Sequence, residues 1–358
     1  MFKRLEQHLE SNHILAAEQF GFRKDISNEN AIFTFTNNVL TELNQRHQVV
    51  GGIFCDLTKA FDCVNHNILL HKLYYYGIRG KGYCWLKSYF ENRKQKVSTS
   101  PHTLEQENSS NWEIITSGVP QGSILGPLLF IIYLNDLPGG LNQGANPVIN
   151  ADDTSILLTA NTNDQLKSKF HSMLAYMIEW FSANSLALNM EKTNIMKFTT
   201  NYRQSEVFQI IHQNKIVMGV NNIKFLGLEL GKHVSWKNHI QKLLPKLSSA
   251  CYLARRMYAC CNLNTIKMIY FTYFHAIMEY GIIFWGNSVE SKRIFQKQKR
   301  IIRIMTGTTT RTSCRPLFRE LQILTLASQY IFSLTRFLSS NLKIYKFNTS
   351  IHNLNTRH

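Results

Sequence analysis

The stretch VINADDTSILLT, residues 148–159, decides the fold that we expect for this chain. Two acidic residues, Asp152 and Asp153, stand side by side between apolar runs, and the run after them is short and rich in strand-favouring residues. We therefore predict a buried strand–turn–strand unit with two carboxylates at its tip. Like charges this close raise each other's pKa, and burial adds to the cost, so a divalent metal ion would stabilise the pair. The alternative is an ordinary solvated hairpin turn, in which Asp is common.

Composition and charge restrict the class of protein. The chain has 358 residues, of which 44% are hydrophobic and 12% aromatic, and this indicates a globular protein of two or three subdomains. The formal net charge of +17 predicts a polyanionic partner, nucleic acid before membrane. We find no secretory signal pattern, and the most apolar run, residues 124–134, is too short to span a bilayer. The seven cysteines lack paired C-x2-C spacing, which favours a reduced intracellular compartment over disulfides or a zinc module.

A third acidic residue follows another predicted core strand. The segment QVVGGIFCD, residues 48–56, predicts a buried strand that ends at Asp56, and the end of a buried strand is a common place for chemistry. Either Asp62 or Asn65 is expected to cap the next helix, and we interpret Asp62 as a structural cap rather than a ligand. Phe61 stands near the same strand end, and its simplest interpretation is core packing.

The first part of the chain predicts two helices and a basic turn between them. Residues 1–18 carry a partial apolar stripe that indicates a helix. Gly21 permits a turn beside Arg23 and Lys24, which are either a solvated loop or a contact to a triphosphate or a nucleic-acid backbone. Ser27, or the residue after it, is expected to cap a helix that continues through residue 43.

Two further segments have features of nucleic-acid or nucleotide contacts. Residues 79–100 alternate cations, among them Arg93 and Lys94, with aromatic side chains. This pattern suits a nucleic-acid groove and equally an amphipathic surface helix. Residues 117–138 form a loop punctuated by glycine and proline that leads into an apolar helix, so the backbone can approach a ligand closely. Gln121 lies in the middle of that loop and could hydrogen-bond a base or a sugar.

Taken in order, these segments resemble the reverse transcriptases of non-LTR, LINE-type (jockey-like) retrotransposons. The motifs that carry the resemblance are GFRKDIS (21–27), D-x4-F-D (56–62), WLKSYFENRKQKV (85–97), SGVPQGSILGP (117–127), ADD (151–153), FSANSLALNMEKTNIMKF (181–198) and IKFLGLEL (223–230). The first resembles the family's fingers motif, and the last two resemble its motif D and its primer-grip motif E. A lone ADD is weak evidence, but seven motifs in sequence at compatible spacing are highly specific.

The resemblance implies an RNA-directed DNA polymerase that adds dNTPs to the 3′-hydroxyl of a DNA primer on an RNA template. By this resemblance, Asp56, Asp152 and Asp153 hold two Mg2+ ions, for which Mn2+ is a substitute. One ion lowers the pKa of the primer 3′-hydroxyl, and the other neutralises the triphosphate and the leaving pyrophosphate. Lys192 is expected near the leaving phosphate as a proton donor, although a lone lysine is most often a surface residue.

The same resemblance assigns the substrate contacts. Phe61 would stand under the incoming sugar and clash with a ribose 2′-OH, and Arg23 would reach the triphosphate. Gln121 and Gly122 would shape the nucleotide and template pocket. The residues expected to contact nucleic acid are Arg93, Lys94, Phe225, Leu226 and Gly227, with a plain turn as the alternative for Gly227. Nuclear residence is an expectation from the family.

The expected fold class is α+β, a right-hand polymerase with fingers and palm over residues 1–231. The palm should be an antiparallel sheet backed by helices, followed by a helical thumb and C-terminal region over residues 232–340 and a loose tail over 341–358. Residues 232–319 contain 16 Lys and Arg against 2 Asp and Glu, which favours a thumb that grips a duplex backbone over a merely solvated surface. Within this region, residues 293–305 predict an amphipathic helix.

Two departures from the family keep a second hypothesis open. The family has an aromatic residue before ADD, whereas this chain has Asn150, so catalytic efficiency is in doubt. The family's earlier fingers segment, its endonuclease domain and its cysteine–histidine knuckles are not visible, which indicates a fragment or a decayed copy. The alternative function is therefore a catalytically weak nucleic-acid-binding remnant. An RNA-templated RNA polymerase is a third alternative, which Phe61 disfavours.

Overall fold

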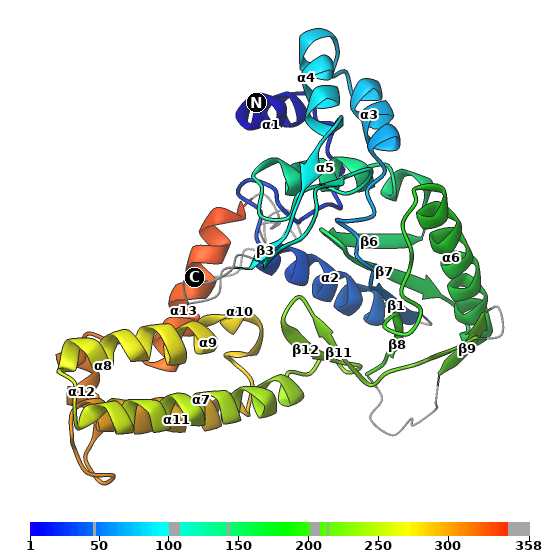
Figure 1. The fold of residues 1–358 in the computed structure, drawn as a ribbon. Coiled ribbons are helices and arrows are strands. Elements are labelled where there is room, and N and C mark those ends of the chain that lie inside the picture. Colours follow the sequence, from blue (N-terminus) through cyan, green and yellow to red (C-terminus); the bar gives the residue numbers. More distant parts are fainter. Residues whose placement is uncertain (46–47, 100–107, 142–143, 201–207, 213–214, 343–358) are drawn as a thin grey trace. The chain divides into compact units, whose positions relative to one another are not determined.

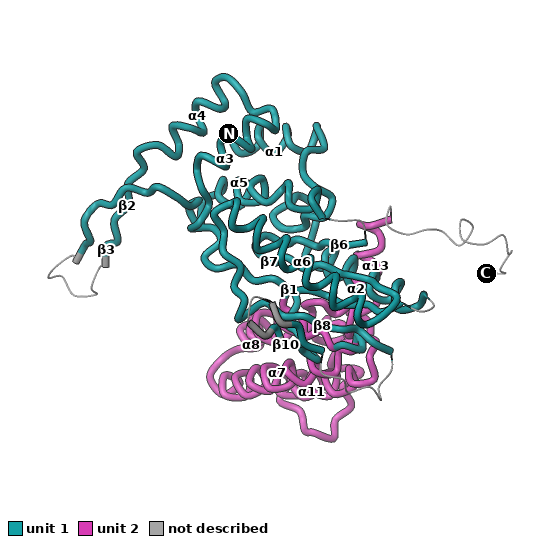
Figure 2. The backbone as a smooth tube through the Cα atoms, turned by 90° about the vertical axis from the view of Figure 1, so that its right-hand side faces the viewer, with its two compact units in different colours: residues 1–226, 232–234 teal, residues 227–231, 235–358 magenta. Residues whose placement is uncertain are grey.

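The computed structural model of the chain describes residues 1–45, 48–99, 108–141, 144–200, 208–212 and 215–342. They fold into two compact units (Figure 2). Unit 1 consists of residues 1–226 and 232–234, and unit 2 consists of residues 227–231 and those from 235 onward. The domain boundaries that the sequence predicts at residues 231 and 340 remain predictions, and most of the expected loose tail lies outside the described residues. No described helix combines the length and the apolar character that crossing a membrane requires.

Unit 1 contains helices and antiparallel strands (Figure 1). Its helices are α1 (Phe2–Ser11), α2 (Asn28–Leu43), α3 (His66–Tyr75), α4 (Gly80–Phe90), α5 (Leu125–Leu134), the short 3-10 helix η1 (Pro138–Gly140) and α6 (Asn163–Ala183). Its strands are β1 (Val49–Cys55), β2 (Lys94–Gln95), β3 (Ser98–Thr99), β4 (Asn108–Ser109), β5 (Glu113–Ile114), β6 (Ala145–Asn150), β7 (Asp153–Ala160), β8 (Asn194–Phe198), β9 (Gln209–His212), β10 (Lys215–Met218) and β11 (Asn222–Phe225).

A four-stranded sheet in the order β6-β7-β1-β8 forms the centre of unit 1, and every neighbouring pair in it is antiparallel. The chain between residues 148 and 159 forms the two strands and the turn that its sequence predicts. Strand β1 lies between β7 and β8, with Cys55 opposite Thr154 on one side and Val50 opposite Phe198 on the other. The sequence prediction of an antiparallel sheet is therefore confirmed.

Helices cover both faces of this sheet. Gly51 lies against the ring of Phe170 of α6, because a Cβ built there would come within 2.6 Å of that ring. Phe54 lies three positions after Gly51, and strand residues an odd number of positions apart face opposite sides of a sheet, so Phe54 points to the other face. There its ring packs against that of Phe35 of α2, with centroids 5.4 Å apart. Burial on both faces explains why β1 is an almost unbroken apolar run rather than an alternating one.

The first predicted helix is shorter than the sequence pattern suggests. The apolar stripe extends over residues 1–18, but α1 ends at Ser11. His13 adopts a left-handed backbone conformation with φ 51°, and the N–H of Ile14 donates to the carbonyl of Leu9 at 3.0 Å. This left-handed closure turns the chain away from the helix axis, although no glycine marks the position.

Two helix caps decide between the alternatives left by the sequence. Ser27 caps α2, and its side chain forms a reciprocal capping box with Asn30. Asn65 caps α3 by accepting from two backbone N–H groups. The interpretation of Asp62 as a helix cap is therefore wrong, and this carboxylate is available for another contact.

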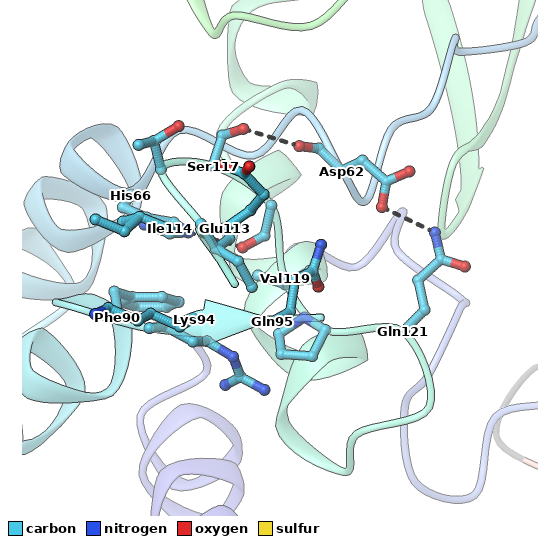
Figure 3. A pocket seen from close by; sticks show the side chains of 15 residues that line it. Asp62, His66, Phe90, Lys94, Gln95, Glu113, Ile114, Ser117, Val119 and Gln121 are labelled. Carbon is cyan, nitrogen blue, oxygen red and sulfur yellow. Dashed lines mark hydrogen bonds between the residues drawn. The ribbon is translucent and has the colours of Figure 1, made fainter. Parts of the chain in front are cut away.

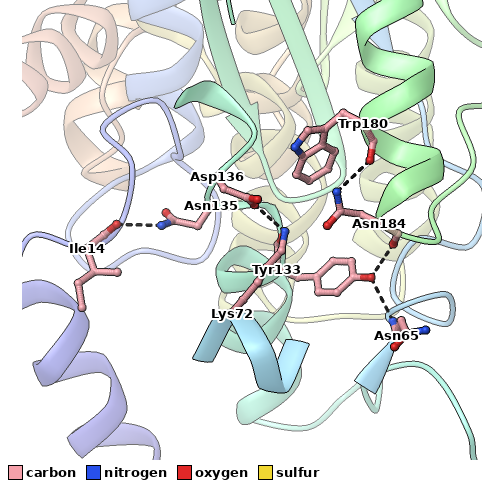
Figure 4. A network of polar contacts seen from close by, with 8 residues as sticks. All are labelled: Ile14, Asn65, Lys72, Tyr133, Asn135, Asp136, Trp180 and Asn184. Carbon is pink, nitrogen blue, oxygen red and sulfur yellow. Dashed lines mark hydrogen bonds and ion pairs between the residues drawn. The ribbon is translucent and has the colours of Figure 1, made fainter. Parts of the chain in front are cut away.

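A polar network joins three helices of unit 1 on one side of the sheet (Figure 4). The hydroxyl of Tyr133 on α5 donates to the carbonyl of Asn184 at 2.5 Å and accepts from the N–H of Asn65 at 3.3 Å. Lys72 of α3 donates to the Tyr133 carbonyl at 2.7 Å and to the Asp136 carboxylate at 2.6 Å. The network fixes the ends of α3, α5 and α6 relative to one another.

Unit 2 is helical apart from one strand, β12 (Leu228–Gly231), among the described residues. Its helices are α7 (Lys237–Tyr258), α8 (Leu263–Ile269), the π-helical turn η2 (Tyr270–His275), α9 (Ala276–Glu279), α10 (Ile282–Trp285), α11 (Ser291–Met305), α12 (Cys314–Leu321) and α13 (Leu326–Ser340). Ile294, Gln298 and Ile301 are buried on one face of α11, as its sequence period predicts. The Gln298 side chain donates to Tyr270 and to the Leu324 carbonyl, and it accepts from the N–H of residue 326.

Candidate active site

The two neighbouring carboxylates lie on the tight turn between β6 and β7. Asn150 and Asp153 are the last residue pair of the two strands, so Ala151 and Asp152 form the turn itself. Ala151 has φ 58°, a left-handed conformation that costs a residue with a side chain about 1–2 kcal/mol. Surrounding contacts must therefore hold this turn.

Residues 18–21 supply those contacts. The N–H of Phe20 donates to the carbonyl of Ile149 at 2.7 Å, which attaches this segment to the edge of β6. The Oε1 atom of the buried Gln19 accepts from the N–H of Gly21 at 3.0 Å and from the N–H of Ala151 at 3.4 Å. A Cβ on Gly21 would lie 2.4 Å from the nitrogen of Ala151, so only glycine allows this approach. Sequence reasoning missed Gln19, because Ala151 lies 132 positions away.

The third carboxylate reaches the same place through the sheet. Cys55 pairs with Thr154 across β1 and β7, so Asp56 and Asp153 lie one residue beyond that pair on adjacent strands. Both line a cavity of about 260 Å³, together with Lys192. The structure therefore brings together two acidic residues that are far apart in the sequence.

Lys192 is placed beside Asp56 by a short turn. The Asp56 carbonyl accepts from the N–H of Asn189 at 2.8 Å, and the Asn189 carbonyl accepts from the N–H of Lys192 at 3.2 Å. The Lys192 ammonium then lies 3.5 Å from the Asp56 carboxylate, with 69% of its side chain exposed. The predicted proton donor is thus beside one predicted metal ligand and remains open to solvent.

Desolvation and charge repulsion both act on Asp153 at the turn. The surrounding protein raises the pKa of Asp153 to about 6, mainly by desolvation and then through the charges of Asp152 and Asp56, while Lys224 acts in the opposite direction. Within the described part of the chain, however, no three His, Cys, Asp or Glu side chains are gathered closely enough to hold a metal ion as a group. Asp56 and Asp153 share the cavity, whereas Asp152 is not among its lining residues.

A second cavity, of about 600 Å³, unites three other predicted residues (Figure 3). Arg93, Lys94 and Gln121 line it. Lys94 begins β2, which pairs with β5, and Arg93 directly precedes it, whereas Gln121 lies in the loop before α5. The Nε2 atom of Gln121 donates to the Asp62 carboxylate at 3.1 Å, which is the contact that occupies this carboxylate instead of a helix cap. Gly118 packs against the backbone of Asp62, where a Cβ would meet the carbonyl oxygen at 2.9 Å.

Gly122 follows Gln121 in the loop before α5. Its φ of 81° requires a left-handed backbone, whereas the space beside it is open, since no described atom lies within 4 Å of a Cβ built there. The glycine therefore sets the direction of the loop rather than making room for a packed neighbour. Its predicted contribution to a nucleotide pocket stays a prediction.

Phe61 and Arg23 are engaged by the protein itself. The Phe61 ring stacks on Phe130 of α5, with centroids 4.2 Å apart, and lines neither cavity. Arg23 donates to the carbonyl of Ala16 at 3.0 Å and lies 3.7 Å from the carboxylate of Glu10, with 15% of its side chain exposed. Core packing accounts for Phe61 as placed, and a triphosphate contact would require Arg23 to leave these partners. Both assigned roles stay predictions.

The predicted primer-grip residues form a buried segment and a turn. Phe225 is 4% exposed and packs against Phe35, with ring centroids 4.9 Å apart. Phe225 and Leu226 both line the cavity of the carboxylates. Because Phe225 is only 4% exposed, its side chain has little surface left for nucleic acid. Leu226 and Gly227 have φ of 43° and 86°, which makes them the turn that the alternative interpretation of Gly227 anticipated.

Comparisons with known proteins agree with this architecture. The family model described as reverse transcriptase (RNA-dependent DNA polymerase) matches residues 1–230. The chain is 26% identical over 344 residues to the probable RNA-directed DNA polymerase from transposon BS of Drosophila melanogaster, covering 91% of this chain and 36% of that protein. It is 24% identical over 320 residues to the RNA-directed DNA polymerase from mobile element jockey of the same species, covering 85% of this chain and 33% of that one.

The chain thus spans about a third of the length of these relatives. Among solved structures, its fold is similar to that of apo telomerase from Candida tropicalis, with a TM-score of 0.50 and 14% identity over 94% of this chain and 55% of that one. At this identity the similarity shows the fold alone.

Proposed function

Because this chain belongs to the reverse transcriptase family, we propose that it is an RNA-directed DNA polymerase that extends a DNA primer with dNTPs on an RNA template. One observation carries the proposal. Asp56 and Asp153 lie at the ends of adjacent antiparallel strands and line one cavity with Lys192. Two carboxylates beside a cation at the ends of two central strands suit nucleotidyl transfer, in which charge must be stabilised on the attacking and leaving oxygens.

Divalent metal ions are general to this family, and the residues present fit such ions. Carboxylate oxygens are the ligands that Mg2+ prefers. The pKa of Asp153 is raised first by desolvation and then by the charges of Asp152 and Asp56, and a cation at this turn would offset both effects. We propose Mg2+ held by Asp56 and Asp153, with Asp152 completing the set from the next position of the turn. When bound, the metal supplies activation of the primer hydroxyl and neutralisation of the triphosphate.

The chain's own residues supply the remaining chemistry. Lys192 holds an exposed ammonium beside Asp56, where it can donate a proton to an oxygen of the leaving pyrophosphate. Arg93 and Lys94 line the second cavity as cations and can bind phosphates of the template. Gln121 lines the same cavity and presents its amide beside them. The localisation that we propose, the nucleus, follows from the family alone.

Primer extension tests the proposal directly. We expect the folded chain to extend an oligo(dT) primer on a poly(rA) template with dNTPs and Mg2+, and to stop when the metal is chelated. Asp56→Asn should abolish extension, because the neutral amide oxygen lacks the negative charge with which a carboxylate binds Mg2+. The matched control Asp164→Asn changes an acid in the first turn of α6 and should leave extension unchanged.

Binding of the primer–template must be measured beside extension. Asp56→Asn should leave the affinity within about twofold, since the cations rather than the acids bind phosphates. A folded wild-type chain that binds the primer–template yet extends nothing would contradict the polymerase proposal. In that case Asn150→Tyr is tested. If extension appears, the defect lies at position 150; if it does not, the active site as a whole has lost its activity.

A further inference from the structure

A third cavity is lined only by residues of unit 2. Its volume is about 990 Å³, and it is formed by one side of α11, by α12 and by the segment that leads into α13. None of its lining residues belongs to the candidate active site. The proposed polymerase activity therefore does not account for this cavity.

The rim of this cavity is strongly cationic. Lys299, Arg303, Arg315 and Arg319 line it, and no Asp or Glu is among the described lining residues. None of the four forms an ion pair within the described part of the chain. Four such cations around one concave surface favour a ligand that carries several negative charges.

The wall of the cavity is apolar and aromatic. The half-buried ring of Phe295 lies 6.2 Å from that of the buried Phe318, centroid to centroid, so Phe295 rather than Phe318 offers an accessible ring. The Lys299 ammonium lies 4.5 Å from the centroid of the Phe295 ring. Leu324 lines the same cavity and is 45% exposed. A ligand of phosphates alone would gain nothing from this surface, whereas a nucleotide can place its base against it and its phosphate on the cations.

Hydrogen bonds hold this cavity in shape. Gln298, buried on α11, fixes the segment before α13 through the carbonyl of Leu324 and the N–H of Leu326, both at 2.9 Å. The Nε atom of Arg303 donates to the carbonyl of Thr312 at 2.9 Å, which ties α11 to the chain before α12. The cavity is therefore preformed, and a ligand would not have to order its walls on binding.

We propose that this cavity, whose described lining residues are all in unit 2 and include none of the candidate active site, binds single-stranded nucleic acid. A single strand is the class that fits, because its bases are free to leave the stack and contact an apolar wall, whereas those of a duplex are not. The proposal rests on unit 2 alone and does not depend on whether the chain polymerises.

Fluorescence anisotropy with labelled oligonucleotides tests it on the full chain. The double variant Arg315→Gln/Arg319→Gln removes two exposed cations of α12 that line the cavity. The matched control Arg255→Gln/Arg256→Gln removes two exposed cations from the last turn of α7, which do not line it. The probes are a single-stranded RNA, a single-stranded DNA and an RNA duplex of the same length.

We expect the cavity variant to bind the single strands at least tenfold more weakly and the control variant to change by less than twofold. In a plot of log affinity against log salt, each single-strand phosphate that the protein neutralises contributes about 0.7 to the size of the slope. The cavity variant lacks two cations, so the size of its slope should be smaller by about 1.4. Phe295→Leu, which keeps an apolar side chain, should weaken the binding of single strands more than that of the duplex. Equal effects of both double variants, or equal weakening for duplex and single strands, would overturn the proposal.

Discussion

At the scale of single residues, the carboxylate turn depends on a buried amide. Gln19 is 1% exposed, and its Oε1 atom satisfies the backbone N–H groups of Gly21 and Ala151 together. Its Nε2 atom has no hydrogen-bond partner among the described residues. The side chain thus acts only as an acceptor there, and it holds the left-handed turn from which Asp152 and Asp153 project.

Removing that acceptor should loosen the turn. We expect Gln19→Leu to lower the free energy of unfolding by about 1–3 kcal/mol, because two buried N–H groups are left without a partner. Primer extension should fall further than template binding. The exposed Gln45→Leu is the control and should stay within about 0.5 kcal/mol. Chemical denaturation measures the free energy of unfolding of both variants. An equal, small effect would show that the hydrogen bonds of Gln19 do not hold the turn.

Asp153 gives a pH dependence with a defined sign. Its pKa in the folded chain, about 6, lies above its ordinary value of 3.8, so protonation favours the folded state. The stabilising contribution is therefore complete below pH 3.8 and is lost as pH rises through about 6. We expect Asp153→Asn to raise the melting temperature of the metal-free protein above about pH 6 and not at about pH 4. The effect should be small, since the side chain is in contact with solvent.

At the scale of elements, one lysine connects α3 to the end of α5. Burial lowers the pKa of Lys72, and the contact with Asp136 opposes that shift. Only 13% of the Lys72 side chain is exposed, and its ammonium also lies 4.8 Å from the centroid of the Trp180 ring. The position therefore combines two charge-assisted hydrogen bonds with an aromatic contact.

Replacing this lysine should destabilise unit 1. We expect Lys72→Met to cost about 1–3 kcal/mol, because a buried carbonyl and the Asp136 carboxylate are left without their donor. Lys87→Met, which removes an exposed pair with Glu91, should cost less than about 0.5 kcal/mol. Thermal denaturation of both variants measures the difference. A Lys72 variant as stable as the control would mean that the network in Figure 4 does not hold the helices together.

Sequence patterns predicted the elements better than their ends. The strands that carry Asp56 and Asp153 were predictable, because each is an apolar run bounded by an acid. The left-handed closure at His13 was not, since neither glycine nor proline marks it. Gln19 could not be found either, because the residue that needs it, Ala151, becomes its neighbour only through the sheet. Short-range pattern therefore indicates the carboxylates, and long-range packing determines what positions them.

At the scale of the whole molecule, the two units carry titrating groups with opposite effects. His239, 4% exposed in unit 2, has a pKa lowered to about 4, mainly by burial. Its Nδ1 atom accepts from the N–H of Glu229 at 3.4 Å, so the ring is neutral in the folded chain. Acid therefore weakens unit 2 at His239, whereas in unit 1 protonation of Asp153 favours the folded state.

The pH dependence at His239 has a calculable size. The stabilising contribution of the neutral ring is complete above pH 6.5, the ordinary value, and is lost as pH falls toward 4, which amounts to about 2–3 kcal/mol. We expect His239→Gln to flatten the decline of stability over this range, because glutamine stays neutral and can accept from the same N–H. Urea denaturation at about pH 7 and about pH 4.5 measures it. An unchanged difference between the two conditions would show that folding does not lower the pKa of His239.

The close approach of Gly21 to Ala151 has a genetic consequence. Every missense change in the codon for residue 21 adds at least a Cβ, which would stand 2.4 Å from a backbone nitrogen of the carboxylate turn. We expect each such change to displace the turn that carries Asp152 and Asp153 and so to be selected against in a copy of the gene whose product must work. Where many copies of this gene accumulate in a genome, the codon for residue 21 should therefore separate copies still maintained by selection from those drifting toward pseudogenes.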